Sequence, residues 1–149
     1  SSIGAELGSM KVSEQIDAME VSGANPIEYL VVTRVLACIL MIPLLTLMAD
    51  ALALMGGFTA SNLNNDIPLG LYFNKAFAAV SFADLIPAVI KTLFFGFAIG
   101  FVGCYKGYNS NRGTESVGIA ANSAVVAASL WIIMLDAIAV QLTSVFAYN

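Results

Sequence analysis

The chain has 149 residues, of which 59% are hydrophobic and only 11% are charged, and its formal net charge is −4. Soluble domains carry about 25% charged residues, so this composition predicts an integral membrane protein of one domain. No basic cluster points to nucleic acid. Because the sequence contains no His, it offers no Ser-His-Asp, Cys-His or HExxH arrangement, and we expect neither an enzyme nor a metal site.

Residues 4–37 are the most polar part of the chain. Val12, Ile16 and Met19 recur at i, i+4 and i+7 and predict a short amphipathic helix outside the bilayer, which Gly23 ends. Its polar side is acidic, which disfavours anionic lipid headgroups and favours docking in a protein groove; a helix resting on lipid is the alternative. The residues expected at this partner interface are Val12, Glu14, Gln15, Ile16, Asp17, Met19 and Glu20.

The first spanning helix is predicted over residues 26–57. Asn25 is its cap, Pro26 takes the first helical position and Glu28 can reach back to complete a capping box. We expect Pro43 to kink this helix and Gly56-Gly57 to end it. An outer loop with a short interfacial helix follows over residues 58–83.

Two more spans are predicted over residues 84–105 and 117–147, joined by a polar loop over 106–116. The bias of Lys and Arg places residues 1–25 and this loop in the cytoplasm. The expected fold is therefore an all-α membrane protein with three transmembrane helices. A cytoplasmic amphipathic helix precedes them, and a short interfacial helix lies on the outer side.

Five polar residues are predicted to form an intramembrane cluster that lines a lipid path. At a rise of about 1.5 Å per residue, three ionisable side chains converge on the outer half of the bilayer. Polar residues on the third span, with Thr143, also recur every seven positions as one stripe. The alternative is a structural Lys91–Asp136 pair with Asp50 at the interface. The cluster comprises Asp50, Lys91, Asn122, Ser129 and Asp136.

Small residues follow one face of the second span. Thr92, Gly96, Gly100, Gly103 and Gly107 are three or four positions apart. Such a seam lets helix backbones approach closely in lipid, so we expect Gly96, Gly100 and Gly103 to mark a helix contact. The alternative is that glycine is simply common in membrane helices.

The run GAELGSMKVSEQIDAMEVSGANPIEYL closely resembles the signature of the MlaE/YrbE-type permeases, the membrane subunits of lipid-transporting ABC systems. The matching pieces are Ala5-Glu6-Leu7-Gly8, Met10-Lys11-Val12, Glu14-Gln15-Ile16-Asp17-Ala18-Met19, Asn25-Pro26 and Arg34. The chain departs from many members at Thr33, where they have Pro. It also opens inside the motif, so we expect it to be the C-terminal portion of a permease.

This resemblance implies a permease subunit that moves phospholipid or a related hydrophobic substrate between membranes. It implies that the amphipathic helix couples to a separate ABC ATPase subunit. It also implies a homodimer of permeases, an outer lipid-binding partner of the MCE type, and the bacterial inner membrane rather than an organellar envelope. The chain has no G-x-x-x-x-G-K-[ST] loop, the motif that binds the phosphates of ATP. We therefore expect this chain to bind no cofactor and the partner subunit to use the ATP.

Two interpretations that assign the protein to other functional classes stay open. One is an ion- or proton-coupled carrier that uses Lys91 and Asp136 as a relay. The other is a membrane scaffold that transports nothing. The acidic amphipathic helix and its capped elbow argue against both, because neither function needs them.

Overall fold

The computed structural model describes residues 1–80 and 82–147, and all regular secondary structure in them is helical. The elements are α1 Ser2–Val12, α2 Gln15–Val21, the π-helix η1 Ile27–Val32, α3 Thr33–Asn64, α4 Leu69–Ala79, α5 Phe82–Tyr108 and α6 Glu115–Ala147. Three stretches are long and apolar enough to cross a membrane: Ile27–Asn64, Asp84–Tyr108 and Glu115–Ala147. The predicted all-α class is therefore confirmed, and so is the presence of three helices with the length and composition to span a membrane.

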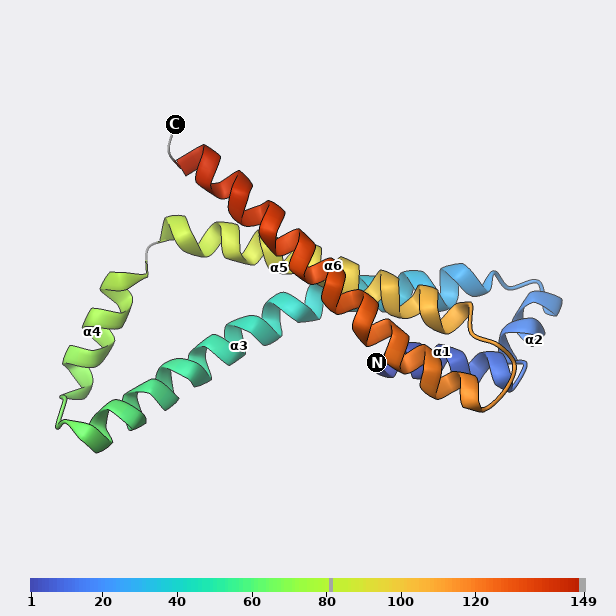
Figure 1. The fold of residues 1–149 in the computed structure, drawn as a ribbon, viewed down its shortest axis with the longest axis horizontal. Coiled ribbons are helices and arrows are strands. Elements are labelled where there is room, and N and C mark those ends of the chain that lie inside the picture. The colour runs from blue at the N-terminus through green and yellow to red at the C-terminus, as the bar shows by residue number, and fades with distance from the viewer. Residues whose placement is uncertain (81, 148–149) are drawn as a thin grey trace.

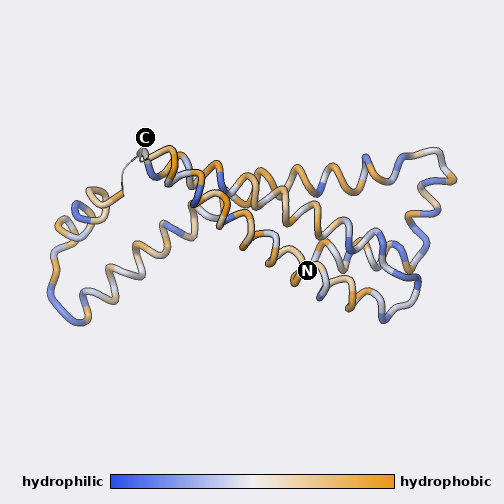
Figure 2. Tube along the Cα trace, turned by 45° about the horizontal axis from the view of Figure 1, so that its top comes forward, coloured by the Kyte–Doolittle hydropathy of each residue, from blue (hydrophilic) through white to orange (hydrophobic). Residues whose placement is uncertain are grey.

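The molecule is compact only at one end, where α1 packs against α5 and α6 (Figure 1). Leu7, Ile16, Leu30 and Cys104 form the buried cluster there. We call this the basic end, because it holds four of the six basic residues of the chain, Lys11, Arg34, Lys106 and Arg112, although acidic residues lie there as well. Figure 2 shows hydrophilic segments gathered there and again at the α3–α4 turn, with mostly apolar helices between them.

The glycine seam brings α5 into close contact with α3, as its spacing predicts. A Cβ atom on Gly96 would lie 2.6 Å from the carbonyl oxygen of Cys38, and one on Gly100 would lie 2.9 Å from Cα of Val35. The seam continues onto α1, since a Cβ on Gly103 would lie 3.3 Å from Ile3. Beyond this contact α3 bends away from α5 and runs towards α4 (Figure 1).

The predicted end of the first span at Gly56-Gly57 is wrong, because α3 continues to Asn64. Glycine costs a helix only about 1 kcal/mol relative to alanine, which is too little to stop an apolar helix. Neither glycine adopts the left-handed conformation that ends many helices, since Gly23 is the positive-φ glycine among the described residues. Gly57 instead makes room for Tyr72 of α4, whose hydroxyl would lie 2.5 Å from an added Cβ.

The predicted single amphipathic helix is also wrong, because it breaks into α1 and α2 at Ser13 and Glu14. Glu14 adopts a left-handed conformation with φ of 57°. The Ser13 hydroxyl donates a hydrogen bond to the Ser9 carbonyl at 2.9 Å, which gives the chain a local alternative to continuing the helix. Val12 therefore lies on a different helix from Ile16. Gly23, with φ of 80°, follows the end of α2 as predicted.

Candidate functional site

Lys91 of α5 and Asp136 of α6 form an ion pair. Nζ of Lys91 lies 2.8 Å from Oδ1 of Asp136. The two side chains are 33% and 48% exposed in this chain, so the pair lies at the edge of the α5–α6 contact rather than inside it. Nζ of Lys91 also lies 5.8 Å from the centre of the Phe95 ring. The helix rise predicted that these two residues would be partners, and the structure pairs them.

A groove of about 370 Å³ opens beside the pair, between the first turns of α5 and the last turns of α6. Lys91 lies about 10 Å along α5 from Asp84, at a rise of 1.5 Å per residue. The groove thus leads from the end of the molecule opposite the basic end to the ion pair. Its lining residues are Asp84, Pro87, Ala88, Lys91, Ala139, Val140, Thr143, Ser144 and Ala147.

Asp50 does not join this pair. It is exposed on α3 and forms no ion pair within residues 1–80 and 82–147. The reason is the course of α3, which contacts α5 through Val35, Cys38 and Ile39 and then diverges (Figure 1). The helical rise predicts how deep Asp50 lies in the bilayer. It does not predict how far Asp50 lies from the neighbouring helices.

Asn122 and Ser129 of the polar stripe on α6 face outward from this chain, whereas Asp136 pairs with Lys91 and Thr143 lines the groove beside that pair. Asn122 and Ser129 are exposed, and the Ser129 hydroxyl donates to the Val125 carbonyl of its own helix at 2.7 Å. The side of α6 that packs on the rest of the chain carries Ser116, Ala120 and Ala124. The predicted grouping of Asn122 and Ser129 with Lys91 therefore has no contact to support it in the described residues.

The side of α2 that was expected to meet a partner instead packs on this chain's own core. Ile16 is 0% exposed, and Met19 packs against the same buried cluster. Ile16 cannot be the anchor in a partner's groove, because it lies in the buried cluster with Leu7 of α1 and Cys104 of α5. The side chains that α2 turns outward are Glu14, Gln15, Ala18, Glu20 and Val21, the last of them 90% exposed.

Polar contacts tie α2 to the far end of α5 and to the α5–α6 turn. Nη2 of Arg112 lies 2.9 Å from Oδ2 of Asp17. The Tyr108 hydroxyl donates to Oε1 of Glu20 at 3.4 Å, and Nζ of Lys11 lies 5.3 Å from the centre of the Tyr108 ring. A displacement of α2 would therefore be passed to the junction of the second and third spans.

A further ion pair links α1 to the start of the first span. Nη2 of Arg34 lies 2.6 Å from Oε1 of Glu6, and Nη1 donates to the Leu30 carbonyl at 3.2 Å. The Ile27 N–H donates to Oδ1 of Asn25 at 3.2 Å, which agrees with the predicted cap. Sequence reasoning missed the pairs made by Glu6 and Asp17, because each joins residues far apart in the chain and no local pattern marks them.

Comparison with known proteins decides the family. Residues 1–142 match the Permease MlaE family. The chain belongs to the MlaE permease family. The resemblance seen in residues 4–30 thus extends over nearly the whole chain, including all three long helices.

Relatives of this MlaE permease are known from bacteria and from plastid-bearing organisms. A probable ABC transporter permease protein of Rickettsia typhi is 37% identical over 141 residues, which is 95% of this chain and 54% of that protein. A probable ABC transporter permease protein of Pyropia yezoensis is 35% identical, and the match covers 91% of this chain and 52% of that protein. The Arabidopsis thaliana protein named TRIGALACTOSYLDIACYLGLYCEROL 1, chloroplastic, is 36% identical over 91% of this chain and 39% of that protein. The chain spans about half the length of most of these relatives.

Proposed function

We propose that the whole protein is the permease subunit of an ABC transporter that moves phospholipid or a related hydrophobic substrate between membranes, with energy from a separate ATPase subunit. The observation that carries this proposal is the position of α2. It lies at the basic end, beside the three long helices, with one face packed on the core and a polar face turned outward. Membership of the MlaE permease family supports the same function.

The ATPase subunit would dock on the outward face of α2, around Glu14, Gln15 and Glu20. This face is acidic and carries the exposed Val21, so a partner groove with basic and apolar residues would complement it. Asp17 and Arg112 would then carry the movement of α2 to the α5–α6 turn. The partner would use the ATP.

The lipid path would run past the Lys91–Asp136 pair. The pair is half-exposed and lies at the inner end of a groove between α5 and α6. An ion pair within a spanning segment is stable when its partners satisfy each other and can exchange contacts with a charged headgroup when one passes. The Arabidopsis relative is named after a lipid, trigalactosyldiacylglycerol, and this supports a lipid substrate.

A second permease copy would cover the outward stripe of Asn122 and Ser129 on α6. Exposed polar groups in a spanning helix are costly against lipid, whereas a partner helix can offer them hydrogen bonds. We further propose a homodimer in the bacterial inner membrane, with an MCE-type lipid-binding protein on the outer side next to α4.

An ion- or proton-coupled carrier is the second candidate, and the 2.8 Å contact between Lys91 and Asp136 is what favours it. One experiment separates the two. The purified assembly is reconstituted in vesicles with a labelled phospholipid and a lipid-binding acceptor, and transfer is followed with ATP, without ATP, and with an imposed proton gradient. Transfer that needs ATP and ignores the gradient supports the ABC permease. Transfer driven by the gradient alone supports the carrier and overturns our proposal.

A further inference from the structure

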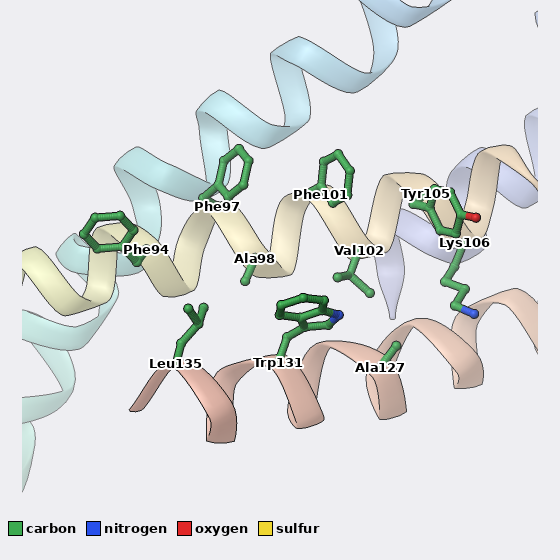
Figure 3. A pocket seen from close by; sticks show the side chains of 10 residues that line it. All are labelled: Phe94, Phe97, Ala98, Phe101, Val102, Tyr105, Lys106, Ala127, Trp131 and Leu135. Carbon is green, nitrogen blue, oxygen red and sulfur yellow. The ribbon is translucent and has the colours of Figure 1, made fainter. Parts of the chain in front are cut away.

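A second, larger groove lies between α5 and α6, on the half of these helices nearer the basic end (Figure 3). Its volume is about 630 Å³, and its lining is apolar except at Tyr105 and Lys106. It shares no lining residue with the groove beside the Lys91–Asp136 pair. The two grooves therefore occupy opposite halves of the α5–α6 contact.

A row of aligned aromatic rings forms one wall of this groove. The ring centres of Phe97 and Phe101 are 5.8 Å apart with 17° between their planes, and those of Phe101 and Tyr105 are 6.5 Å apart with 14°. Trp131 of α6 faces this helix and is 53% exposed (Figure 3). These rings are 49% to 57% exposed and line the same groove as the indole, so the described residues leave the apolar strip that they form open.

Lys106 closes the end of the strip with a positive charge. Its side chain extends from α5 towards α6 (Figure 3), and within residues 1–80 and 82–147 it forms no ion pair. Arg34, Lys91 and Arg112, by contrast, each have a carboxylate partner. An available ammonium at the end of an apolar groove complements a molecule that has an anionic head and an apolar tail.

The dimensions fit a lipid of one leaflet. Phe94 and Lys106 both line the groove and lie twelve positions apart, or about 18 Å at the helical rise. Half of the hydrocarbon core is about 15 Å thick. Lys106 lies two residues before the end of α5, where its side chain can reach the headgroup layer. By the positive-inside rule, this layer is the cytoplasmic one.

We propose that this groove binds one anionic phospholipid of the cytoplasmic leaflet, with an acyl chain along Phe97, Phe101 and Trp131 and the phosphate on Lys106. This site is separate from the proposed transport path and does not rest on the proposed function. A lipid held there would stabilise the α5–α6 contact from its open side.

The test uses Trp131, the single tryptophan of this chain. The full-length permease is reconstituted in vesicles of unlabelled phosphatidylcholine. Increasing fractions of a lipid with brominated acyl chains are then included, and this lipid is phosphatidylglycerol in one series and phosphatidylcholine in the other. Bromine quenches indole fluorescence on contact. The same titration on a Trp131→Phe variant gives the background from any other tryptophan, and the difference is the Trp131 signal.

We expect brominated phosphatidylglycerol to compete for the site about fivefold better than brominated phosphatidylcholine, the factor expected for one lysine near a membrane surface. Lys106→Gln should abolish this preference while quenching by phosphatidylcholine persists. Lys75→Gln is the matched control, since Lys75 is an exposed lysine on α4 and should leave the preference unchanged.

Three results would overturn the proposal. Equal quenching by the two lipids in the parent protein would mean that Trp131 meets only bulk lipid. A preference that survives Lys106→Gln would place the headgroup elsewhere. Absence of quenching by either lipid would mean that a second copy or another protein segment covers the groove. Because the readout is lipid contact, none of these results depends on whether transport needs ATP.

Discussion

Oδ2 of Asp17 lies 2.9 Å from Nη2 of Arg112, and this contact joins α2 to the turn between α5 and α6. The two residues belong to segments that were both predicted to lie on the cytoplasmic side, and no contact between them was predicted from the sequence. The Asp17 and Arg112 side chains are 34% and 68% exposed, so the pair is accessible to water and contributes little to stability. Its importance would lie in transmitting movement between a partner and the spanning helices.

The first prediction tests this transmission. Arg112→Ala should change the stability of the permease by less than about 1 kcal/mol, as for other surface ion pairs. In the proposed assembly it should leave the ATPase subunit bound but lower lipid transfer per ATP hydrolysed severalfold. Exchanging the charges in Asp17→Arg with Arg112→Asp should recover part of the loss. Unchanged coupling in Arg112→Ala would mean that the pair transmits nothing.

The second prediction concerns Ile16 and α2. Ile16→Glu would bury an unpaired carboxylate in the cluster with Leu7 and Cys104, so it should destabilise the permease by more than about 3 kcal/mol. Loss of the ATPase subunit from this variant would follow from misfolding and would not identify a docking face. Thermal unfolding in detergent checks the effect. A variant with the parent's melting temperature would contradict the burial of Ile16.

Gln15→Lys gives the sharper test of docking, and is the third prediction. Gln15 is exposed on α2, so the change should leave the melting temperature unaltered while it adds a positive charge to the acidic face beside Glu14 and Glu20. We expect less ATPase subunit on co-purification. Asn74→Lys, an exposed change on α4 at the opposite end, is the matched control. If both variants retain the subunit equally, docking on this face of α2 is refuted.

What the sequence predicts well here is position along a helix. The fixed rise per residue placed Lys91 and Asp136 at one depth on antiparallel helices, and the seam of Gly96 and Gly100 marked a close contact. The sequence did not predict the lateral course of α3, because that depends on where its contact with α5 stops. The left-handed residue at Glu14 was also missed, since only glycine normally signals that conformation.

The fourth prediction concerns the seam. Gly100→Ala should destabilise the permease by about 1–3 kcal/mol, because a Cβ there would lie 2.9 Å from Cα of Val35 and the helices would have to separate. Gly56→Ala is the matched control in α3, where an added Cβ meets nothing within 4 Å. That change should be neutral or slightly stabilising, since alanine favours the helix. Equal melting temperatures for the two variants would show that α3 and α5 are not in close contact.

The last prediction concerns the Lys91–Asp136 pair. Removing one partner leaves the other charge uncompensated within a spanning segment, so Lys91→Ala or Asp136→Ala alone should cost about 2–3 kcal/mol. The double change removes both charges and should recover part of this loss. A double-mutant cycle on thermal unfolding measures the coupling, and lipid transfer is followed on the same four proteins. If the stability losses of the two single variants simply add up in the double variant, the two charges do not stabilise each other, despite their 2.8 Å contact. Recovered stability with recovered transfer would mean that the pair only fixes the register of α5 and α6. Recovered stability without recovered transfer would support our proposal that these charges act on the lipid path.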